Sequence, residues 1–223
     1  MSGKPSLVFF TGLGADERLL EPQRSLPYEL ITPPWVEPEE TETLPEYARR
    51  MAATVDWPIR FVLAGVSFGG MVAADLAPQV KPAGLVLLST CLYARPIRSV
   101  SRFVNALTKA VEEADDPSPA SFSRIFLNIF AEFGEDVQRV MAAMLQRTSV
   151  DLLRWAGQRI VDWEGASEAP CPRIWIHGEN DTVIPAHKVH PDVLIAGGGH
   201  LINWTHREQV NQAIRGFVES LDA

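Results

Sequence analysis

Short apolar segments, each followed by glycine or other small residues, constrain the fold of this chain more than any other feature. They lie at residues 6–10, 59–64, 84–88, 173–177 and 192–196, and they are nearly continuously apolar rather than alternating. Strands of this kind are typical of a sheet that is covered on both faces, as in a parallel sheet flanked by helices. A weaker segment, residues 28–32, is expected to form an edge strand. The sequence therefore predicts an α/β fold with about six parallel strands.

Helical patterns lie between these strands. In residues 43–55 the apolar side chains share one helical face, and Thr43 with Glu46 forms a capping box at the start. Residues 68–80 are rich in glycine and alanine, which allow a helix to pack closely on a sheet. A second capping box, Thr205 with Glu208, is expected to begin the last helix. Alternating strands and helices predict right-handed crossovers between parallel strands.

Residues 93–165 interrupt this alternation. They contain no good strand pattern, and stripes such as Phe122, Phe126 and Phe133 predict three or four helices. We expect a helical insert between two strands of the sheet. On this division, residues 1–92 and 166–223 form the α/β core.

The composition excludes several classes of protein. Of the 223 residues 46% are hydrophobic and 22% are charged, which is typical of a globular domain. A net charge of −8 without a basic cluster argues against nucleic-acid binding. Cys91 and Cys171 are far apart and have no metal-like spacing, and no apolar run is long enough for a signal peptide or a membrane span. We expect a cytoplasmic protein with reduced thiols; the oligomeric state stays open.

The segment Gly65–Gly69 reads Gly-Val-Ser-Phe-Gly and matches the pattern G-x-S-x-G. It lies between an apolar strand and a small-residue helix, which is the position of a nucleophile elbow. The strained turn leaves no room for a Cβ atom two residues before or after the serine. Backbone N–H groups at the start of the helix favour developing negative charge. Ser67 is therefore the candidate nucleophile, and a tight glycine-rich turn without chemistry is the alternative.

A serine nucleophile needs a general base, and the base needs an orienting acid. His200 follows the last strand in a glycine-rich loop, at the same sheet edge as Ser67, and is the candidate base. Asp181 lies four residues beyond the strand 173–177 and is the candidate acid. Another position for the acid, residues 89–94, holds no carboxylate.

The other histidines and carboxylates fit these roles less well. His177 ends a strand and is expected to be buried or structural. Glu179 leaves the same strand too early to reach the base, and Asp192 is expected to open the last strand at the opposite edge of the sheet. His187 and His190 have a spacing that could serve a metal ion, but no third ligand accompanies them. We therefore expect no metal and no organic cofactor.

The order serine, aspartate, histidine resembles that of the α/β-hydrolase superfamily. The resemblance covers nearly the whole chain, and it is carried by TGLGAD (11–16), GVSFGG (65–70), HGENDTVIP (177–185) and GGGH (197–200). It implies a catalytic triad of Ser67, Asp181 and His200. It also implies an oxyanion hole formed by the backbone N–H groups of Leu13 and Phe68.

Two features depart from the pattern of that family. Thr11 stands where the family often has a histidine before the oxyanion loop, so the support of this loop is expected to differ. The strand at residues 6–10 leads directly into the loop, whereas the family usually has additional N-terminal strands, one of them antiparallel. We therefore expect a reduced, all-parallel α/β-hydrolase fold, in which residues 93–165 correspond to the family's helical cap over the active site.

The resemblance implies a small capped serine hydrolase that resembles esterases and thioesterases. Such an enzyme cleaves a carboxylic ester or thioester of a small-molecule acyl substrate through an acyl-enzyme. Trp35 and Trp204 lie in loops near the predicted pocket and are candidates to line it. Two alternatives stay open: a C–C bond hydrolase or lyase that uses the same site, and a non-catalytic ligand receptor that retains the triad.

Overall fold

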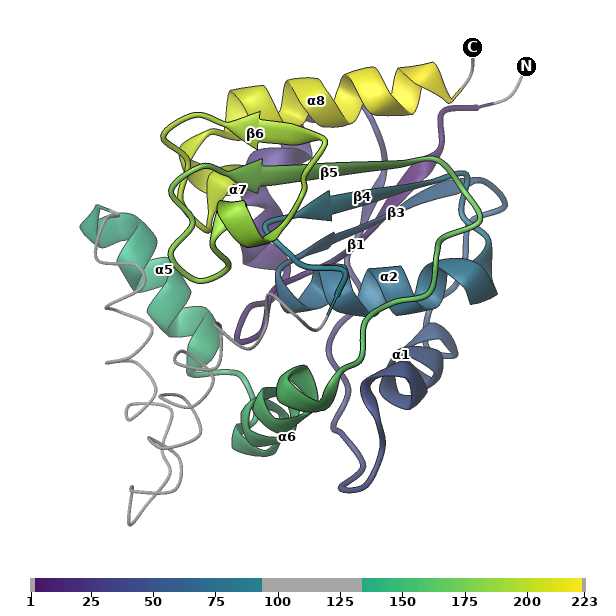
Figure 1. Cartoon of the computed structure of the whole chain (residues 1–223), viewed down its shortest axis with the longest axis vertical. Coiled ribbons are helices and arrows are strands. Elements are labelled where there is room, and N and C mark those ends of the chain that lie inside the picture. The colour runs from purple at the N-terminus through teal and green to yellow at the C-terminus, as the bar shows by residue number, and fades with distance from the viewer. Residues whose placement is uncertain (1–2, 94–133, 222–223) are drawn as a thin grey trace.

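The computed structural model describes residues 3–93 and 134–221 (Figure 1). Its sheet contains six strands in the order β2-β1-β3-β4-β5-β6. These strands are β1 (Ser6–Phe10), β2 (Leu30–Ile31), β3 (Phe61–Val66), β4 (Gly84–Leu88), β5 (Arg173–Gly178) and β6 (Val193–Ile195). Every pairing between them is parallel, and β2 is an edge strand. The prediction of a reduced, all-parallel sheet of about six strands is confirmed.

Two hydrophobic cores lie on opposite faces of the sheet. In β1, Leu7 and Phe9 pack into one core, whereas Val8 and Phe10 pack into the other. All four side chains are almost completely buried. Successive side chains of a strand point to opposite faces, so burial on both faces requires a continuous apolar run. This is the physical reason for the apolar segments in the sequence.

Helices cover both faces of this sheet (Figure 1). On one face lies α2 (Phe68–Val80), with α1 (Leu44–Ala52) beyond it. On the other face lie α8 (Arg207–Ser220) and the 3₁₀ helix η1 (Glu17–Ser25). Two shorter elements, η2 (Ala186–Lys188) and α7 (Ile202–Thr205), belong to the loops that follow β5 and β6. Among the described residues, none of the helices combines the length and the hydropathy needed to cross a membrane.

One of the two predicted capping boxes is present. At the start of α1 the Glu46 carboxylate accepts a hydrogen bond from the Thr43 backbone N–H at 2.8 Å. The capping box expected at Thr205 is wrong, because Thr205 ends α7 and its hydroxyl donates to the Leu201 carbonyl at 3.2 Å. His206 occupies the N-cap position of α8 instead.

The predicted cap is described only in its second half. This half consists of α5 (Glu135–Leu145) and α6 (Val150–Asp162), whereas residues 94–133, including the predicted stripe of Phe122, Phe126 and Phe133, lie outside the described residues. An antiparallel bridge joins Tyr93 to Gly165, so the two ends of the predicted insert lie side by side. The role of this segment as a cap stays a prediction.

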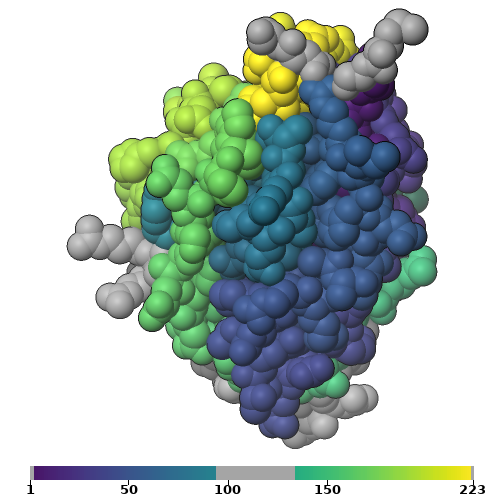
Figure 2. All heavy atoms as spheres, turned by 90° about the vertical axis from the view of Figure 1, so that its right-hand side faces the viewer, coloured from purple at the N-terminus to yellow at the C-terminus, as the bar shows by residue number. Residues whose placement is uncertain are grey.

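Two tryptophans attach α6 and the residues that follow it to the core. The Trp155 ring lies 4.5 Å from the Tyr47 ring of α1, measured between centroids, and its indole N–H donates to the Glu42 carbonyl at 3.1 Å. The Trp163 indole N–H donates to the Asp75 carboxylate of α2 at 2.9 Å. Figure 2 shows the green segment after α6 lying against the blue surface formed by α2 and its neighbours.

Asp75 makes the free energy of unfolding of the chain depend on pH. Burial raises the pKa of its carboxyl from 3.8 to about 6, although the hydrogen bond from Trp163 acts in the opposite direction. Between these two pH values the folded chain holds a proton that the unfolded chain has released. Stability therefore falls as the pH rises through this window, and the loss is complete above the folded-state pKa.

We expect Asp75→Asn to remove this loss while keeping an acceptor for Trp163. Relative to the wild type, the free energy of unfolding of the variant should rise by about 2–3 kcal/mol between about pH 4 and about pH 7.5. Urea unfolding of both proteins at the two pH values measures this difference. A difference that does not change with pH would contradict the assignment.

Candidate active site

Ser67 lies in the sharp turn between β3 and α2. Its φ of 53° and ψ of −120° are rarely adopted by residues other than glycine. Two hydrogen bonds hold the turn: the Ser67 N–H donates to the Leu88 carbonyl at 2.9 Å, and the Thr90 hydroxyl donates to the Ser67 carbonyl at 2.6 Å. The strand–turn–helix arrangement expected from the sequence is therefore present. Leu88 at the end of β4 and Thr90 just after it stabilise the strained turn.

The two glycines of the motif are required by close backbone contacts. A Cβ atom on Gly65 would lie 2.2 Å from the Gly69 carbonyl oxygen. A Cβ atom on Gly69 would lie 2.2 Å from the Thr11 carbonyl oxygen. Both obstacles are backbone atoms, which cannot rotate away as a flexible side chain can. The absence of a side chain at Gly65 lets the start of α2 pack on β3, and its absence at Gly69 lets the turn approach β1 and the loop after it.

This packing makes a prediction about stability. We expect Gly69→Ala to lower the free energy of unfolding by at least about 3 kcal/mol, because the methyl group must displace the backbone of β1 and its following loop. Gly216→Ala is the matched control: this exposed position in α8 has no atom within 4 Å of an added Cβ. Alanine there should stabilise the protein by about 0.5–1 kcal/mol. Urea unfolding of both variants checks the pair, and equal effects would contradict it.

The structure brings Ser67, His200 and Asp181 together at the carboxyl ends of β3, β5 and β6. His200 Nε2 lies 3.0 Å from Ser67 Oγ, and His200 Nδ1 lies 2.8 Å from Asp181 Oδ2. An ionised carboxylate can only accept hydrogen bonds, so Nδ1 carries the proton. Nε2 is then the acceptor for the serine hydroxyl. This is the tautomer that a general base beside Ser67 requires.

Asp181 is a buried carboxylate with a complete set of donors. Its Oδ1 accepts hydrogen bonds from the backbone N–H groups of Val183 and Ile184, both at 2.8 Å. Burial alone would raise the pKa of Asp181, but attraction to the protonated form of His200 and hydrogen bonds from His177 and His200 outweigh burial. The pKa of this carboxyl is therefore held well below its usual value, and Asp181 stays ionised.

The loop after β1 lies against the elbow. A turn closes between Gly12 and Ala15, whose N–H donates to the Gly12 carbonyl at 3.2 Å. A Cβ atom on Gly12 would be only 3.7 Å from Ser67 Cβ. Thr11 stands at the position where a histidine was expected from the family resemblance. Its hydroxyl donates to the Ala15 carbonyl at 2.9 Å and so supports this turn. Within the described residues, the N–H groups of Leu13 and Phe68 donate to no protein acceptor.

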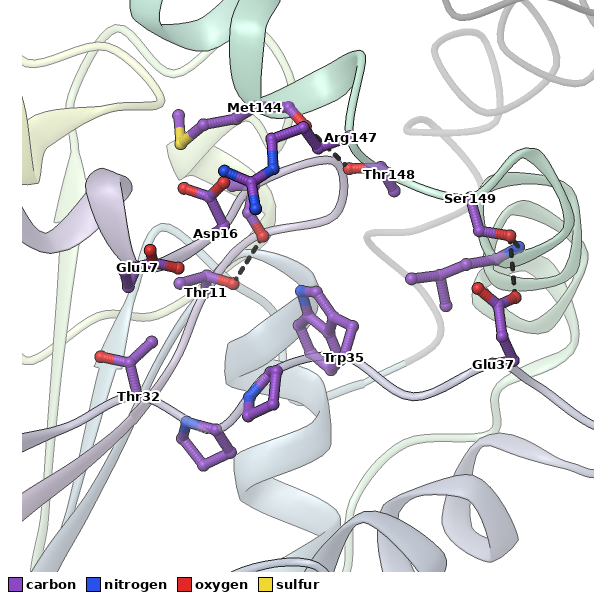
Figure 3. Close-up of a pocket in the computed structure, with 14 residues that line it drawn as sticks. Thr11, Asp16, Glu17, Thr32, Trp35, Glu37, Met144, Arg147, Thr148 and Ser149 are labelled. Atoms are coloured by element: carbon purple, nitrogen blue, oxygen red, sulfur yellow. Dashed lines mark hydrogen bonds between the residues drawn. The ribbon is translucent and has the colours of Figure 1, made fainter.

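A cleft of about 220 Å³ lies beside this loop (Figure 3). Trp35 and Arg147 extend into it from opposite sides, Trp35 from the segment after β2 and Arg147 from the connection between α5 and α6. The Trp35 ring packs on Phe68, with 5.4 Å between the centroids. Its indole nitrogen is buried and has no hydrogen-bond partner among the described residues. The placement of Trp35 is thus compatible with the predicted contact to a substrate.

Trp204 is placed differently from Trp35. Its indole N–H donates to the Leu19 carbonyl at 2.7 Å, and its ring packs with the core between the sheet and α8. It is absent from the described lining of the cleft. Trp204 lies in α7, which begins two residues after His200, and its side chain is directed toward η1. Among the described residues, no group of three His, Cys, Asp or Glu side chains is arranged to hold a metal ion.

Comparison with known proteins identifies the family of this chain. A model of the alpha/beta hydrolase family matches residues 9–213, and the chain belongs to this family. It is 24% identical over 249 aligned positions to the biotin biosynthesis bifunctional protein BioHC of Cellvibrio japonicus, covering 98% of this chain and 48% of that protein. The chain therefore spans about half the length of this curated relative.

Solved structures of other proteins share the fold. An enol-lactonase from Burkholderia xenovorans superposes with a TM-score of 0.76 at 16% identity, covering 98% of this chain and 92% of that one. An esterase from Exiguobacterium antarcticum superposes with a TM-score of 0.75 at 17% identity, covering 98% and 93%. At such identities the likeness shows the fold alone.

Proposed function

We propose that this protein is a serine hydrolase that cleaves a carboxylic ester or thioester through an acyl-enzyme. The observation that carries the proposal is the continuous hydrogen-bonded line from Ser67 through His200 to Asp181, with distances of 3.0 Å and 2.8 Å. The strained elbow adds support, because strain of this kind concentrates at functional sites. Membership of the alpha/beta hydrolase family makes the same chemistry a natural expectation.

In the proposed mechanism, His200 Nε2 takes the proton of Ser67 while the serine oxygen attacks the carbonyl carbon of the substrate. The resulting oxyanion accepts hydrogen bonds from the backbone N–H groups of Leu13 and Phe68. His200 then gives its proton to the leaving alcohol or thiol, which leaves an acyl-enzyme on Ser67. A water molecule, activated by His200, releases the acid. Asp181 holds the tautomer of His200 and stabilises its positive form.

The substrate side of the site is also part of the proposal. The cleft beside Trp35 is smaller than the roughly 300–1,000 Å³ of pockets for drug-sized ligands. Its described lining includes Thr11 and Trp35 but none of Ser67, Asp181 and His200, so the volume is that of the space beside the elbow. We propose a short acyl or alcohol group for this space, and residues 93–165 as the cap of the site. The esterase and the enol-lactonase that share the fold are named for cleavage of ester-type bonds, which supports the choice of bond. A cytoplasmic location stays a prediction.

A panel of acyl esters and acyl thioesters of increasing chain length tests the proposed function. We expect turnover of short-chain members, and a pre-steady-state burst of about one product molecule per chain where deacylation is slow. The ester and thioester series, matched in acyl group, separate the two bond types. Absence of turnover on every member of both series would contradict the proposal.

A further inference from the structure

A second histidine contacts the carboxylate of Asp181. His177 is the fifth residue of β5, its side chain is fully buried, and its Nε2 lies 3.2 Å from Asp181 Oδ2. The same nitrogen lies 2.8 Å from the carbonyl oxygen of Ile184. The other ring nitrogen, Nδ1, is buried and has no partner among the described residues.

These contacts define the tautomer of His177. Both neighbours of Nε2, a carbonyl oxygen and an ionised carboxylate, only accept hydrogen bonds, so Nε2 carries a proton. A second proton on Nδ1 would be a buried donor without an acceptor, which is costly. His177 is therefore a neutral ring whose single N–H is shared between Ile184, over the shorter distance, and Asp181, over the longer one.

The set of donors around Asp181 is then complete. Oδ1 accepts from two backbone N–H groups of the loop after β5, Oδ2 accepts from His200 Nδ1 at 2.8 Å, and His177 Nε2 lies 3.2 Å from the same oxygen. Within the described part of the chain, Cys91 is a further titratable group that interacts with Asp181. Burial, together with the charge of Asp181, raises the pKa of its thiol to about 12, so it stays neutral and adds no charge.

We infer that His177 is a positioning residue for the proposed reaction, holding Oδ2 of Asp181 in line with His200 and drawing part of its negative charge away from His200. The inference rests on the proposed function. His177 also holds the Ile184 carbonyl, and the Ile184 N–H donates to Oδ1 of the same carboxylate. One ring thus acts on both oxygens of Asp181, directly on one and through the loop on the other.

Three variants separate this role from a purely structural one. His177→Gln keeps an N–H donor at the position of Nε2, and His177→Leu removes the donor while filling a similar volume. Ile176→Val is the control: this neighbouring position on β5 is equally buried, and its side chain packs into the core on the opposite face of the sheet. Thermal unfolding of each variant reports its structural cost.

We expect His177→Leu to lower kcat about 10-fold with little change in KM, since the lost hydrogen bond acts on a charged group. Without that donor, His200 experiences more of the charge of Asp181, so the acid limb of the kcat/KM profile should move up by roughly half a pH unit. His177→Gln should restore most of kcat and the position of the limb. An unmoved limb in His177→Leu, or equal losses in the Gln and Leu variants, would overturn the inference.

The tautomer can be measured without any substrate. In ¹⁵N NMR of the wild-type protein with labelled histidine, near neutral pH, we expect His177 to carry its proton on Nε2 and none on Nδ1. A proton on Nδ1 would overturn the inference even if the enzyme were active. Conversely, failure of the wild type to turn over any ester would contradict the proposed function, and the NMR result would still decide the state of His177.

Discussion

Replacing Ser67 by alanine is expected to lower kcat for the best ester of the panel by roughly 10⁶-fold. The substitution removes one oxygen atom, which lies 3.0 Å from His200 Nε2 and is the proposed nucleophile. The Cβ atom and the surrounding turn are retained, so urea unfolding should show a folded protein of similar stability. Steady-state kinetics on both proteins measures the loss.

Ser89 offers a matched control for Ser67. It also follows a strand, has a positive φ of 44° and carries a buried hydroxyl with no hydrogen-bond partner in the described part of the chain. Ser89→Ala should change kcat by less than about 3-fold. If Ser67→Ala retained activity within the range of Ser89→Ala, the nucleophile would have to be another group.

Asp181→Asn is expected to lower kcat by about 10⁴-fold without unfolding the protein. The amide oxygen can still accept from Val183 and Ile184, which turns the amide nitrogen toward His200 Nδ1. That nitrogen donates rather than accepts, so it favours the proton on Nε2 of His200 and blocks the transfer from Ser67. Steady-state kinetics, with circular dichroism to verify the fold, measures the effect.

Glu179 provides the comparison for this acid. It lies on the same loop, but its carboxylate accepts from the Gly197 N–H at 2.9 Å and does not face His200. Glu179→Gln should therefore keep kcat within a few-fold of the wild type. A large loss in Glu179→Gln, or near-full activity of Asp181→Asn, would show that the orienting acid had been misassigned.

The elements best predicted from the sequence are those whose boundaries are marked locally. The strand at residues 6–10, the strand at 84–88 and the helix at 68–80 agree with the structure at both ends. In each case a buried apolar run or a run of small residues ends at residues with distinct backbone requirements. The helix expected at 43–55 ends earlier, at Ala52, because nothing in the sequence marks the last turn.

The meeting of Ser67, Asp181 and His200 was predictable for a topological reason. Parallel strands end at one edge of the sheet, so residues that follow different strands converge there whatever their distance along the chain. A parallel sheet, once predicted, was therefore sufficient to predict that these three residues meet. In Figure 1 the arrowheads of β3, β5 and β6 point to the same side.

Contacts that depend on side-chain direction were less predictable. Trp204 and Trp35 both appear as loop tryptophans, yet the indole of Trp204 bonds to Leu19 because α7 turns it toward η1. The contact of His177 with Asp181 requires the loop after β5 to fold back over the strand. The only signal in the sequence was the four-residue separation of these two residues, which does not distinguish a contact from a simple turn.

Covalent labelling with a fluorophosphonate probe tests the central proposal most directly, because it requires only an activated serine and no knowledge of the substrate. Intact mass spectrometry of the wild-type protein should show one adduct per chain, and peptide mapping should place it on Ser67. Ser67→Ala should not react, whereas Ser89→Ala should react like the wild type. Equal labelling of Ser67→Ala, or an adduct on another residue, would contradict the assignment of Ser67 as the nucleophile.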